Sequence, residues 1–283
     1  MRLLVLFFIG FLVYGMVYAG AYTDQHGLLW KTALLIFGIQ VVVFLPSYLA
    51  KTEHFFDLTG GLTYLSVMLF LGYHQVTTFQ RWDLRSILLI VFISLWAIRL
   101  SVFLFTRVHR VGKDGRFDEI KLSFTRYLLT WVIQGLWVFM CTYPALIVLV
   151  SPEEKEVIFL GLGAFLWVLG WGYEVVADYQ KTKHNKNPEQ KGRFIASGLW
   201  KQSRHPNYFG EWLLWTGITL MAIPVVQSTQ WVAIVTPFFV YLLLNKVSGV
   251  NLLETRADEK WGSDAAYQTY KKNTPVFFPN LFN

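Results

Sequence analysis

Long apolar runs follow one another along the chain, and short polar links separate them. A helix that crosses a bilayer needs about 20 mostly apolar residues, with a range of roughly 17 to 25. Runs of this kind cover residues 3–20, 29–50, 58–79, 84–106, 127–150, 156–177, 207–226 and 229–249. They predict an all-α, polytopic transmembrane helical bundle. The number of spans is seven or eight, because the first run also resembles a signal peptide with a cleavage site at Ala19-Gly20-Ala21.

The polar links predict how the bundle is oriented. The two longest links, residues 107–126 and 178–205, are rich in lysine and arginine, whereas the link at residues 153–156 is mostly acidic. Cytoplasmic loops of membrane proteins carry an excess of lysine and arginine. We therefore expect both basic loops to be cytoplasmic and, with eight spans, both termini as well.

The composition agrees with a membrane protein. Hydrophobic residues make up 54% of the 283 positions and charged residues only 15%, whereas charged residues are about a quarter of a typical soluble domain. The net charge of +7 lies in loops next to spans, so it indicates membrane topology, and we expect no nucleic acid partner. No long polar insertion interrupts the runs, which predicts a single membrane domain over residues 1–283.

Cysteine and histidine usage excludes two kinds of site. Cys141 is the only cysteine, so no intrachain disulfide can form. The six histidines show neither the His-x-x-x-His spacing nor any Cys-x-x-Cys partner that a zinc site would need. We therefore expect no metal.

Ionisable residues that lie within or beside the apolar runs are the first functional candidates, because such residues are costly in a membrane. Two pairs share a spacing of four residues, which places their members on one helix face, and one of these pairs follows a proline suited to a first helical turn. All of these residues fall at the predicted cytoplasmic ends of their runs, so they predict a polar chamber that faces the cytoplasm. The set consists of Asp57, Arg99, Arg107, Glu174, Asp178, Asn207 and Glu211.

The chemistry of this set favours a nucleotide over an ion pathway. Arginines bind phosphates through charge-assisted and often bidentate hydrogen bonds, while carboxylates and an asparagine suit ribose hydroxyls and amides. A simpler interpretation also exists, in which Glu174 or Asp178 pairs with Lys181 and Arg99 pairs with either carboxylate. The chain has no Gly-x-Gly-x-x-Gly sequence after a strand and no Walker loop, so a dinucleotide would not be held by a Rossmann fold.

One continuous motif adds a family resemblance to this chemistry. Residues 197–211 read SGLWKQSRHPNYFGE and resemble the signature of the membrane reductase superfamily that includes the steroid 5α-reductases, most closely its DUF1295 family. The segments WAIRL at 96–100, EVVADYQK at 174–181 and YQTYKK at 267–272 also fit. The resemblance covers nearly the whole chain and is strongest from residue 96, so we expect N-terminal spans in residues 1–95 and a reductase-like, cofactor-binding region in residues 96–283.

The resemblance implies that the cofactor is NADPH, held in a cytoplasm-facing cavity among the C-terminal spans. It implies that Asn207 and Glu211 contact the nicotinamide and ribose, and that Glu174 and Asp178 contact the nucleotide. Arg99 and Arg107 would reach the phosphates. The matching segments complete the predicted cofactor set with Lys181, Arg204, His205, Tyr208 and Tyr267.

The resemblance also suggests where the reaction takes place. Steroid 5α-reductases place a tyrosine three residues before the arginine equivalent to Arg99, and here that position is Trp96; their acidic residue corresponds by topology to Asp57. Together with Tyr64, these are the predicted catalytic residues. The expected reaction is reduction by NADPH of a conjugated C=C bond in a hydrophobic steroid-like, isoprenoid or other lipid enone.

Two other functions fit parts of the sequence. Isoprenylcysteine carboxyl methyltransferases also have an Arg-His-Pro-x-Tyr-x-Gly turn, and Leu253-Glu254 is similar to their later acidic motif. The sulfonium cofactor of such an enzyme has no phosphates and does not call for Arg99 and Arg107. A non-catalytic lipid-binding protein is the other alternative, since Trp96 replaces the tyrosine of the steroid reductases.

Overall fold

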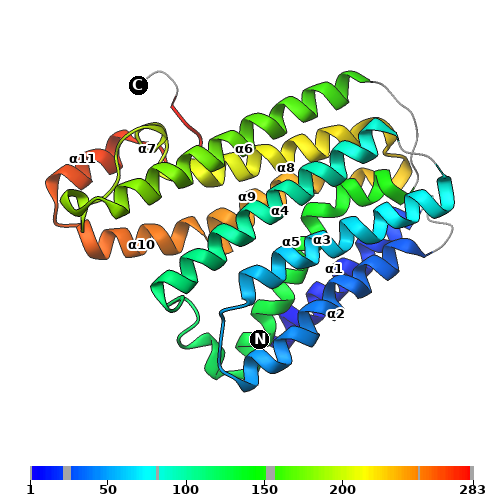
Figure 1. The fold of residues 1–283 in the computed structure, drawn as a ribbon, viewed down its shortest axis with the longest axis horizontal. Coiled ribbons are helices and arrows are strands. Elements are labelled where there is room, and N and C mark those ends of the chain that lie inside the picture. Colours follow the sequence, from blue (N-terminus) through cyan, green and yellow to red (C-terminus); the bar gives the residue numbers. More distant parts are fainter. Residues whose placement is uncertain (1, 22–26, 81–82, 151–156, 248, 281–283) are drawn as a thin grey trace. The chain divides into compact units, whose positions relative to one another are not determined.

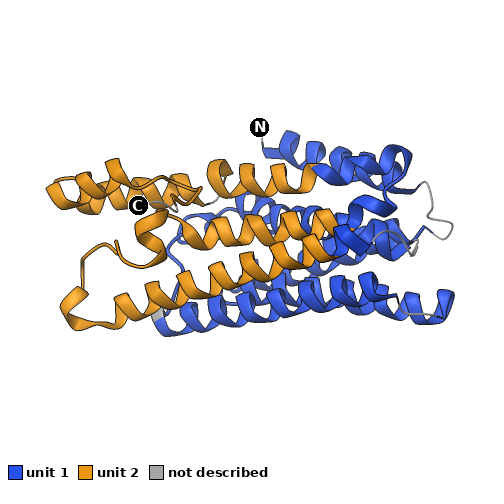
Figure 2. Ribbon diagram, turned by 90° about the horizontal axis from the view of Figure 1, so that it is seen from above, with its two compact units in different colours: residues 1–160, 222–234 blue, residues 161–221, 235–283 orange. Residues whose placement is uncertain are grey.

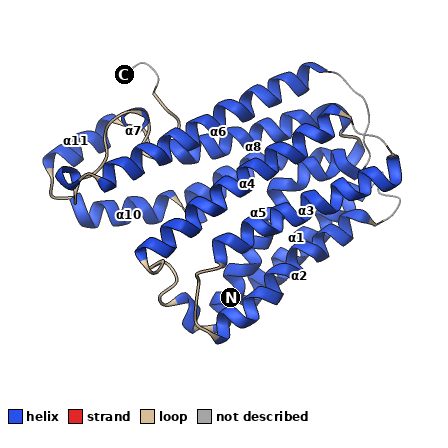
Figure 3. Cartoon of the chain, viewed as in Figure 1, coloured by secondary structure: helices blue, strands red, loops and turns tan. Residues whose placement is uncertain are grey.

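The computed structural model describes residues 2–21, 27–80, 83–150, 157–247 and 249–280, and every regular element in these ranges is helical (Figures 1 and 3). Most of the α-helices are long, and four shorter ones lie in the C-terminal half. The α-helices are α1 (Arg2–Gly20), α2 (Leu28–Leu49), α3 (Phe56–His74), α4 (Leu84–Val111), α5 (Phe124–Val150), α6 (Val157–Lys186), α7 (Leu199–Gln202), α8 (Pro206–Ala222), α9 (Val235–Leu242), α10 (Val250–Trp261) and α11 (Ala265–Asn273).

Six helical segments of the described residues are long and apolar enough to cross a membrane: α1, α2, Leu84–Arg110 of α4, α5, α6, and the stretch Ser228–Trp261. Their surfaces expose large apolar side chains, such as Phe7 and Phe11 of α1 and Phe165 of α6, as expected for helices that face lipid. The predicted all-helical membrane protein is confirmed. The predicted count of seven or eight spans is not, because α3 and α8 are not among the six, and α8 has only 17 residues.

Two helices differ in length from the apolar runs that predicted them. α6 continues to Lys186, nine residues beyond the end of its apolar run, because no helix breaker intervenes before Pro188. Asp178 and Lys181 therefore lie within a helix and not in the predicted loop. α4 ends at Val111, and the next residue, Gly112, has a φ of 88°, the left-handed conformation that glycine adopts at helix C-termini. The acidic link at 153–156 lies outside the described residues.

The chain divides into two compact units, shown in Figure 2: residues 1–160 with 222–234, and residues 161–221 with 235–283. In the first unit α3 packs against α4, and α2 packs against α5. Buried amides join its helices, since Gln40 donates to Thr63 Oγ1 at 2.9 Å and Gln75 donates to the Leu149 carbonyl at 2.6 Å. Because the lipid interior contains no water, polar groups there must find their hydrogen-bond partners within the protein, as these amides do. The single domain over residues 1–283 stays a prediction.

A buried carboxylate anchors the basic segment that follows α4. Glu53 accepts hydrogen bonds from Lys121 Nζ at 2.6 Å and from the backbone N–H of Asp114 at 3.1 Å. Phe117, from the same segment, joins a buried aromatic cluster with Tyr127 and Trp131. Residues 114–121 are thus held against the ends of their neighbouring helices by one ion pair and one apolar contact.

Candidate functional site

Four glycines bring α6 and α8 of the second unit into backbone contact. Gly163 and Gly170 are seven residues apart on α6, and Gly210 and Gly217 are seven apart on α8, so each pair lies on one helix face. A Cβ atom at Gly210 would lie 2.5 Å from the Gly170 carbonyl oxygen, and one at Gly217 would lie 2.5 Å from the Gly163 oxygen. The helices therefore run antiparallel and meet at these glycines, a small-residue contact typical of membrane helices.

This contact aligns the two predicted polar pairs. A Cβ atom at Gly210 would also lie 2.6 Å from the backbone nitrogen of Glu174, which places Glu174 directly beside the residue that precedes Glu211. Glu174, Asp178 and Glu211 are 2%, 6% and 7% exposed, and Asn207 is half-buried. The structure thus brings Glu174 and Glu211 together on neighbouring helices, with Asp178 and Asn207 one turn farther along each helix. Burial of a carboxylate is costly unless it is hydrogen-bonded or ion-paired, so three buried carboxylates on two packed helices mark this region as polar.

The segment between α6 and α8 is fixed to α6 by side-chain hydrogen bonds. Trp200 Nε1 donates to the Ala177 carbonyl at 3.0 Å, and Tyr173 donates its hydroxyl to Gln202 Oε1 at 2.6 Å. Gly198 has a φ of 61°, and a Cβ there would lie 2.5 Å from the Gln180 side chain. Glycine is required at this turn both for its conformation and for its close approach to α6.

The C-terminal tail holds the same segment from another side. Ser203 Oγ donates to the Phe277 carbonyl at 2.9 Å, and the Arg204 N–H donates to the Pro275 carbonyl at 2.9 Å. Tyr270 donates its hydroxyl to the Trp200 carbonyl at 2.7 Å. The C-terminal tail and α11 therefore pack against the end of the basic loop of residues 178–205.

Glu254 of α10 joins the two basic residues of the Arg-His-Pro turn. Its two carboxylate oxygens lie 2.7 Å from Arg204 Nη1 and 2.8 Å from His205 Nε2. Burial lowers the pKa of His205, although Glu254 acts in the opposite direction, so the imidazole is neutral at pH 7. A carboxylate only accepts hydrogen bonds, so the neutral ring carries its proton on Nε2. Nδ1 is then a buried acceptor with no hydrogen-bond partner among the described residues.

Sequence reasoning did not place Glu254 in the site, although the acidic motif at Leu253-Glu254 was a signal. His205 and Glu254 are 49 residues apart, and no local pattern predicts that they meet. Glu254 is nevertheless the residue that orients both basic side chains of the motif.

The remaining predicted cofactor residues of the second unit lie around this group. Lys181 Nζ is 4.6 Å from the centre of the Trp200 ring, a cation–π contact. The Tyr208 ring stacks on His205 at 5.8 Å between centroids. Tyr267 donates to Asp258 at 3.2 Å, and burial raises its pKa to about 12, so its hydroxyl stays protonated.

The predicted catalytic residues lie in the first unit. The rings of Tyr64 and Trp96 meet edge to face, with centroids 5.2 Å apart. Near these rings, a Cβ atom added at Gly61 of α3 would clash with the Ser101 side chain of α4, so the two helices are in close contact there. Asp57 interacts electrostatically with Arg116 and, more weakly, with Arg107.

Arg99 and Arg107 are predicted phosphate ligands, but they belong to the first unit and the other cofactor candidates to the second. Arg99 lies over the Phe103 ring at 5.3 Å. The predicted site residues therefore fall into two groups, one in the first unit around Tyr64 and Trp96 and one in the second unit around Glu174 and Glu211. One chamber built from both stays a prediction.

Together, the apolar helices and the polar groups on two glycine-packed helices define a polytopic α-helical membrane protein. The chain matches the family described as "Protein of unknown function (DUF1295)" over residues 43–274. It belongs to the DUF1295 family.

A relative in Schizosaccharomyces pombe, "Uncharacterized protein C594.04c", is 25% identical over 229 residues. The alignment covers 70% of this chain and 64% of the relative's length. No solved structure matches the chain.

Proposed function

We propose that this protein is a membrane-embedded, NADPH-dependent reductase of a conjugated C=C bond in a hydrophobic lipid enone. The observation that supports it most is the group of buried carboxylates on α6 and α8, which lies beside the basic Arg-His-Pro turn. A soluble substrate or an ion would not require both kinds of group at the end of membrane helices. A nucleotide requires both, because it combines hydroxyls and an amide with phosphates.

The residues of the second unit fit such a cofactor chemically. Carboxylates of Glu174, Asp178 and Glu211 can accept hydrogen bonds from ribose hydroxyls and the nicotinamide amide, and Asn207 can both donate and accept. His205 Nδ1, a buried acceptor without a partner among the described residues, would accept one more. Lys181 and Arg204 would be phosphate donors, and Tyr208 offers a ring for stacking. Tyr267 would support the same region from α11.

The first unit supplies the predicted substrate residues. When bound, NADPH supplies the hydride that forms a new C–H bond at the β-carbon of the enone, while a proton from solvent reaches the α-carbon. The protein orients the substrate and stabilises the negative charge that develops on its carbonyl oxygen. Tyr64 and the Trp96 N–H are donors suited to that oxygen, and Asp57 would accept and relay the proton. Arg99 and Arg107 would bind the cofactor phosphates.

The remaining features belong to the same proposal. The DUF1295 family would be part of the steroid 5α-reductase-like superfamily, and its function would lie in lipid metabolism. With α3 and α8 also crossing the membrane, the bundle would have eight spans, with both termini and both basic loops in the cytoplasm. The cofactor cavity would then open to the cytoplasm, where NADPH is present.

One contact favours a second candidate, an S-adenosylmethionine-dependent methyltransferase similar to the isoprenylcysteine carboxyl methyltransferases. The Arg-His-Pro turn and the acidic residue of Leu253-Glu254 are joined through Arg204, His205 and Glu254. Both sequence features that suggested this class therefore meet at one place.

The two candidates differ in what they consume. Purified protein in detergent should oxidise NADPH when it is given enone lipids of varied size, and it should transfer no methyl group from S-adenosylmethionine to a prenylcysteine acceptor. Methyl transfer without NADPH oxidation would establish the second candidate. Neither activity across a broad lipid panel would remove the reductase proposal.

A further inference from the structure

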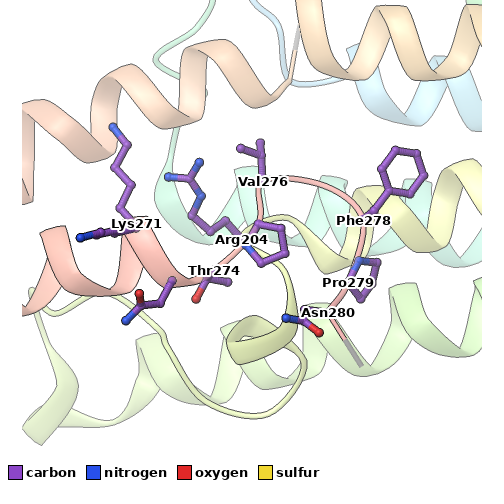
Figure 4. A pocket seen from close by; sticks show the side chains of 10 residues that line it. Arg204, Lys271, Thr274, Val276, Phe278, Pro279 and Asn280 are labelled. Atoms are coloured by element: carbon purple, nitrogen blue, oxygen red, sulfur yellow. The ribbon is translucent and has the colours of Figure 1, made fainter. Parts of the chain in front are cut away.

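A groove on the second unit lies outside the residues assigned so far, apart from Arg204. It has a volume of about 650 Å³, within the range of ligand pockets. Figure 4 shows Arg204 between Lys271 on one side and Phe278, Pro279 and Asn280 on the other. The lining consists of the end of α11 and the tail after it, with Arg204, Lys271, Lys272, Asn273, Thr274, Pro275, Val276, Phe278, Pro279 and Asn280.

Arg204 gives this groove a donor that the surrounding protein does not use. Its side chain is only 9% exposed, and Nη1 is paired with Glu254 at 2.7 Å. Its Nε–H is buried and has no hydrogen-bond acceptor among the described residues. A buried, charged donor without an acceptor is costly, so this N–H is suited to bind an acceptor group that enters the groove.

The other charges in the groove are also positive. Lys271 Nζ lies 2.6 Å and 2.7 Å from the two oxygens of Asp258, which leaves one of its three N–H groups, and Lys272 is exposed. The three positive charges of Arg204, Lys271 and Lys272 outnumber the two negative charges of Glu254 and Asp258, which leaves a net charge of +1. Asn273 and Thr274 add neutral hydrogen-bonding groups to the lining.

We propose that this groove binds a phosphate monoester through Arg204 Nε, Lys271 and Lys272. A phosphate monoester carries close to two negative charges at pH 7 and has three strong acceptor oxygens, which matches three cationic donors around an open groove. Arginine and lysine both recognise phosphate through charge-assisted hydrogen bonds. None of the described residues that line the groove is acidic.

Two sources of this group are chemically equivalent here. One is the 2′-phosphate of NADPH, which rests on the proposed function and would make the enzyme select NADPH over NADH. The other is the headgroup of a lipid such as phosphatidic acid, which the position of the groove on a membrane protein allows. Free inorganic phosphate has the same chemistry as both.

The test uses calorimetric titration of the purified full chain in detergent with adenosine 2′,5′-bisphosphate. Lys272→Gln and Arg204→Lys should each weaken binding about tenfold, as expected for the loss of one charge-assisted hydrogen bond. Arg204→Lys keeps the charge that pairs with Glu254 but removes the Nε–H. The matched control is Lys191→Gln, which removes the same charge from an exposed position outside the groove and should bind as the wild type does.

The source of the phosphate is distinguished by parallel titrations with inorganic phosphate and with phosphatidylcholine vesicles that contain or lack phosphatidic acid. If Lys272→Gln weakens the binding of the bisphosphate and the wild type binds NADPH more tightly than NADH, the phosphate comes from the cofactor. The same sensitivity for phosphatidic acid alone supports the lipid source.

The groove and the proposed function can fail separately. If NADPH is bound and oxidised but Lys272→Gln and Arg204→Lys change no phosphate ligand's affinity, the groove proposal is wrong and the reductase remains. If these variants weaken phosphate binding but NADPH is neither bound nor oxidised, the groove remains and the reductase is wrong. Absence of binding by every phosphate ligand also overturns the groove.

Discussion

The backbone contact between α6 and α8 can be tested with a single methyl group. In Gly170→Ala, the new Cβ atom would lie 2.6 Å from both the Gly210 oxygen and the Leu214 nitrogen. These are backbone atoms, so no side-chain rotation can relieve the clash. An ordinary contact begins at about 3.4 Å, so the helices must separate locally by about 0.8 Å.

The free energy of this change has two opposing parts. Alanine is a better helix former than glycine by about 1 kcal/mol, while overpacking of a tight contact costs about 1 to 3 kcal/mol. The control is Gly172→Ala on the same helix, where the new Cβ would meet nothing within 4 Å. The control should gain the propensity without the clash, so Gly170→Ala should be less stable than Gly172→Ala by about 1 to 3 kcal/mol.

The separation should also affect function, because the contact aligns Glu174 with Glu211. Thermal unfolding in detergent measures stability, and retention of NADPH through gel filtration measures the site. We expect a lower melting temperature and reduced retention for Gly170→Ala, and neither for Gly172→Ala. Equal stability and equal retention in the two variants would refute the proposed helix contact.

Four further predictions concern single residues. Lys121→Met leaves the carboxylate of Glu53, 1% exposed, buried without its cation and should cost about 3 kcal/mol in thermal unfolding; an unchanged melting temperature would contradict this. Burial raises the pKa of Glu53, but the hydrogen bonds from Lys121 and the backbone lower it by more, so the net pKa lies below the ordinary 4.5. The wild type should therefore lose the stabilisation from Glu53 as the pH falls below about 4.5. A melting temperature that does not fall in that range would contradict this. Asn207→Ala should abolish NADPH retention in a folded protein while the exposed Asn185→Ala retains it, and wild-type retention by Asn207→Ala would place the cofactor elsewhere. Tyr64→Phe should lower enone reduction at least tenfold without changing NADPH affinity, and full activity would exclude its hydroxyl from the reaction.

The apolar runs predicted the helices because lipid requires about the same length of apolar chain everywhere. They did not predict that α6 continues to Lys186, since the residues after 177 are polar, and only the absence of a helix breaker before Pro188 permits the extension. The same runs predicted the positions of α3 and α8. α8, with 17 residues, is too short to count as a membrane span by length.

The candidate site was predictable where its residues share a helix, as Glu174 with Asp178 and Asn207 with Glu211. The alignment of the two pairs depends on glycines, which have no side chains of their own to suggest contact. The pairing of Glu254 with the Arg-His-Pro turn and the groove at the C-terminal tail depend on chain segments far apart in sequence. The pairing joins side chains that no local pattern connects. The tail is held largely by hydrogen bonds to backbone carbonyls, which every residue has and no motif marks.

The proposed nicotinamide nucleotide site is built on the buried carboxylates of α6 and α8. Its most direct test is a calorimetric titration of the purified wild type and of Glu211→Gln with NADPH and with S-adenosylmethionine. We predict that NADPH binds to the wild type, that Glu211→Gln weakens this binding at least tenfold, and that S-adenosylmethionine does not bind. Binding of S-adenosylmethionine with no binding of NADPH would contradict the account.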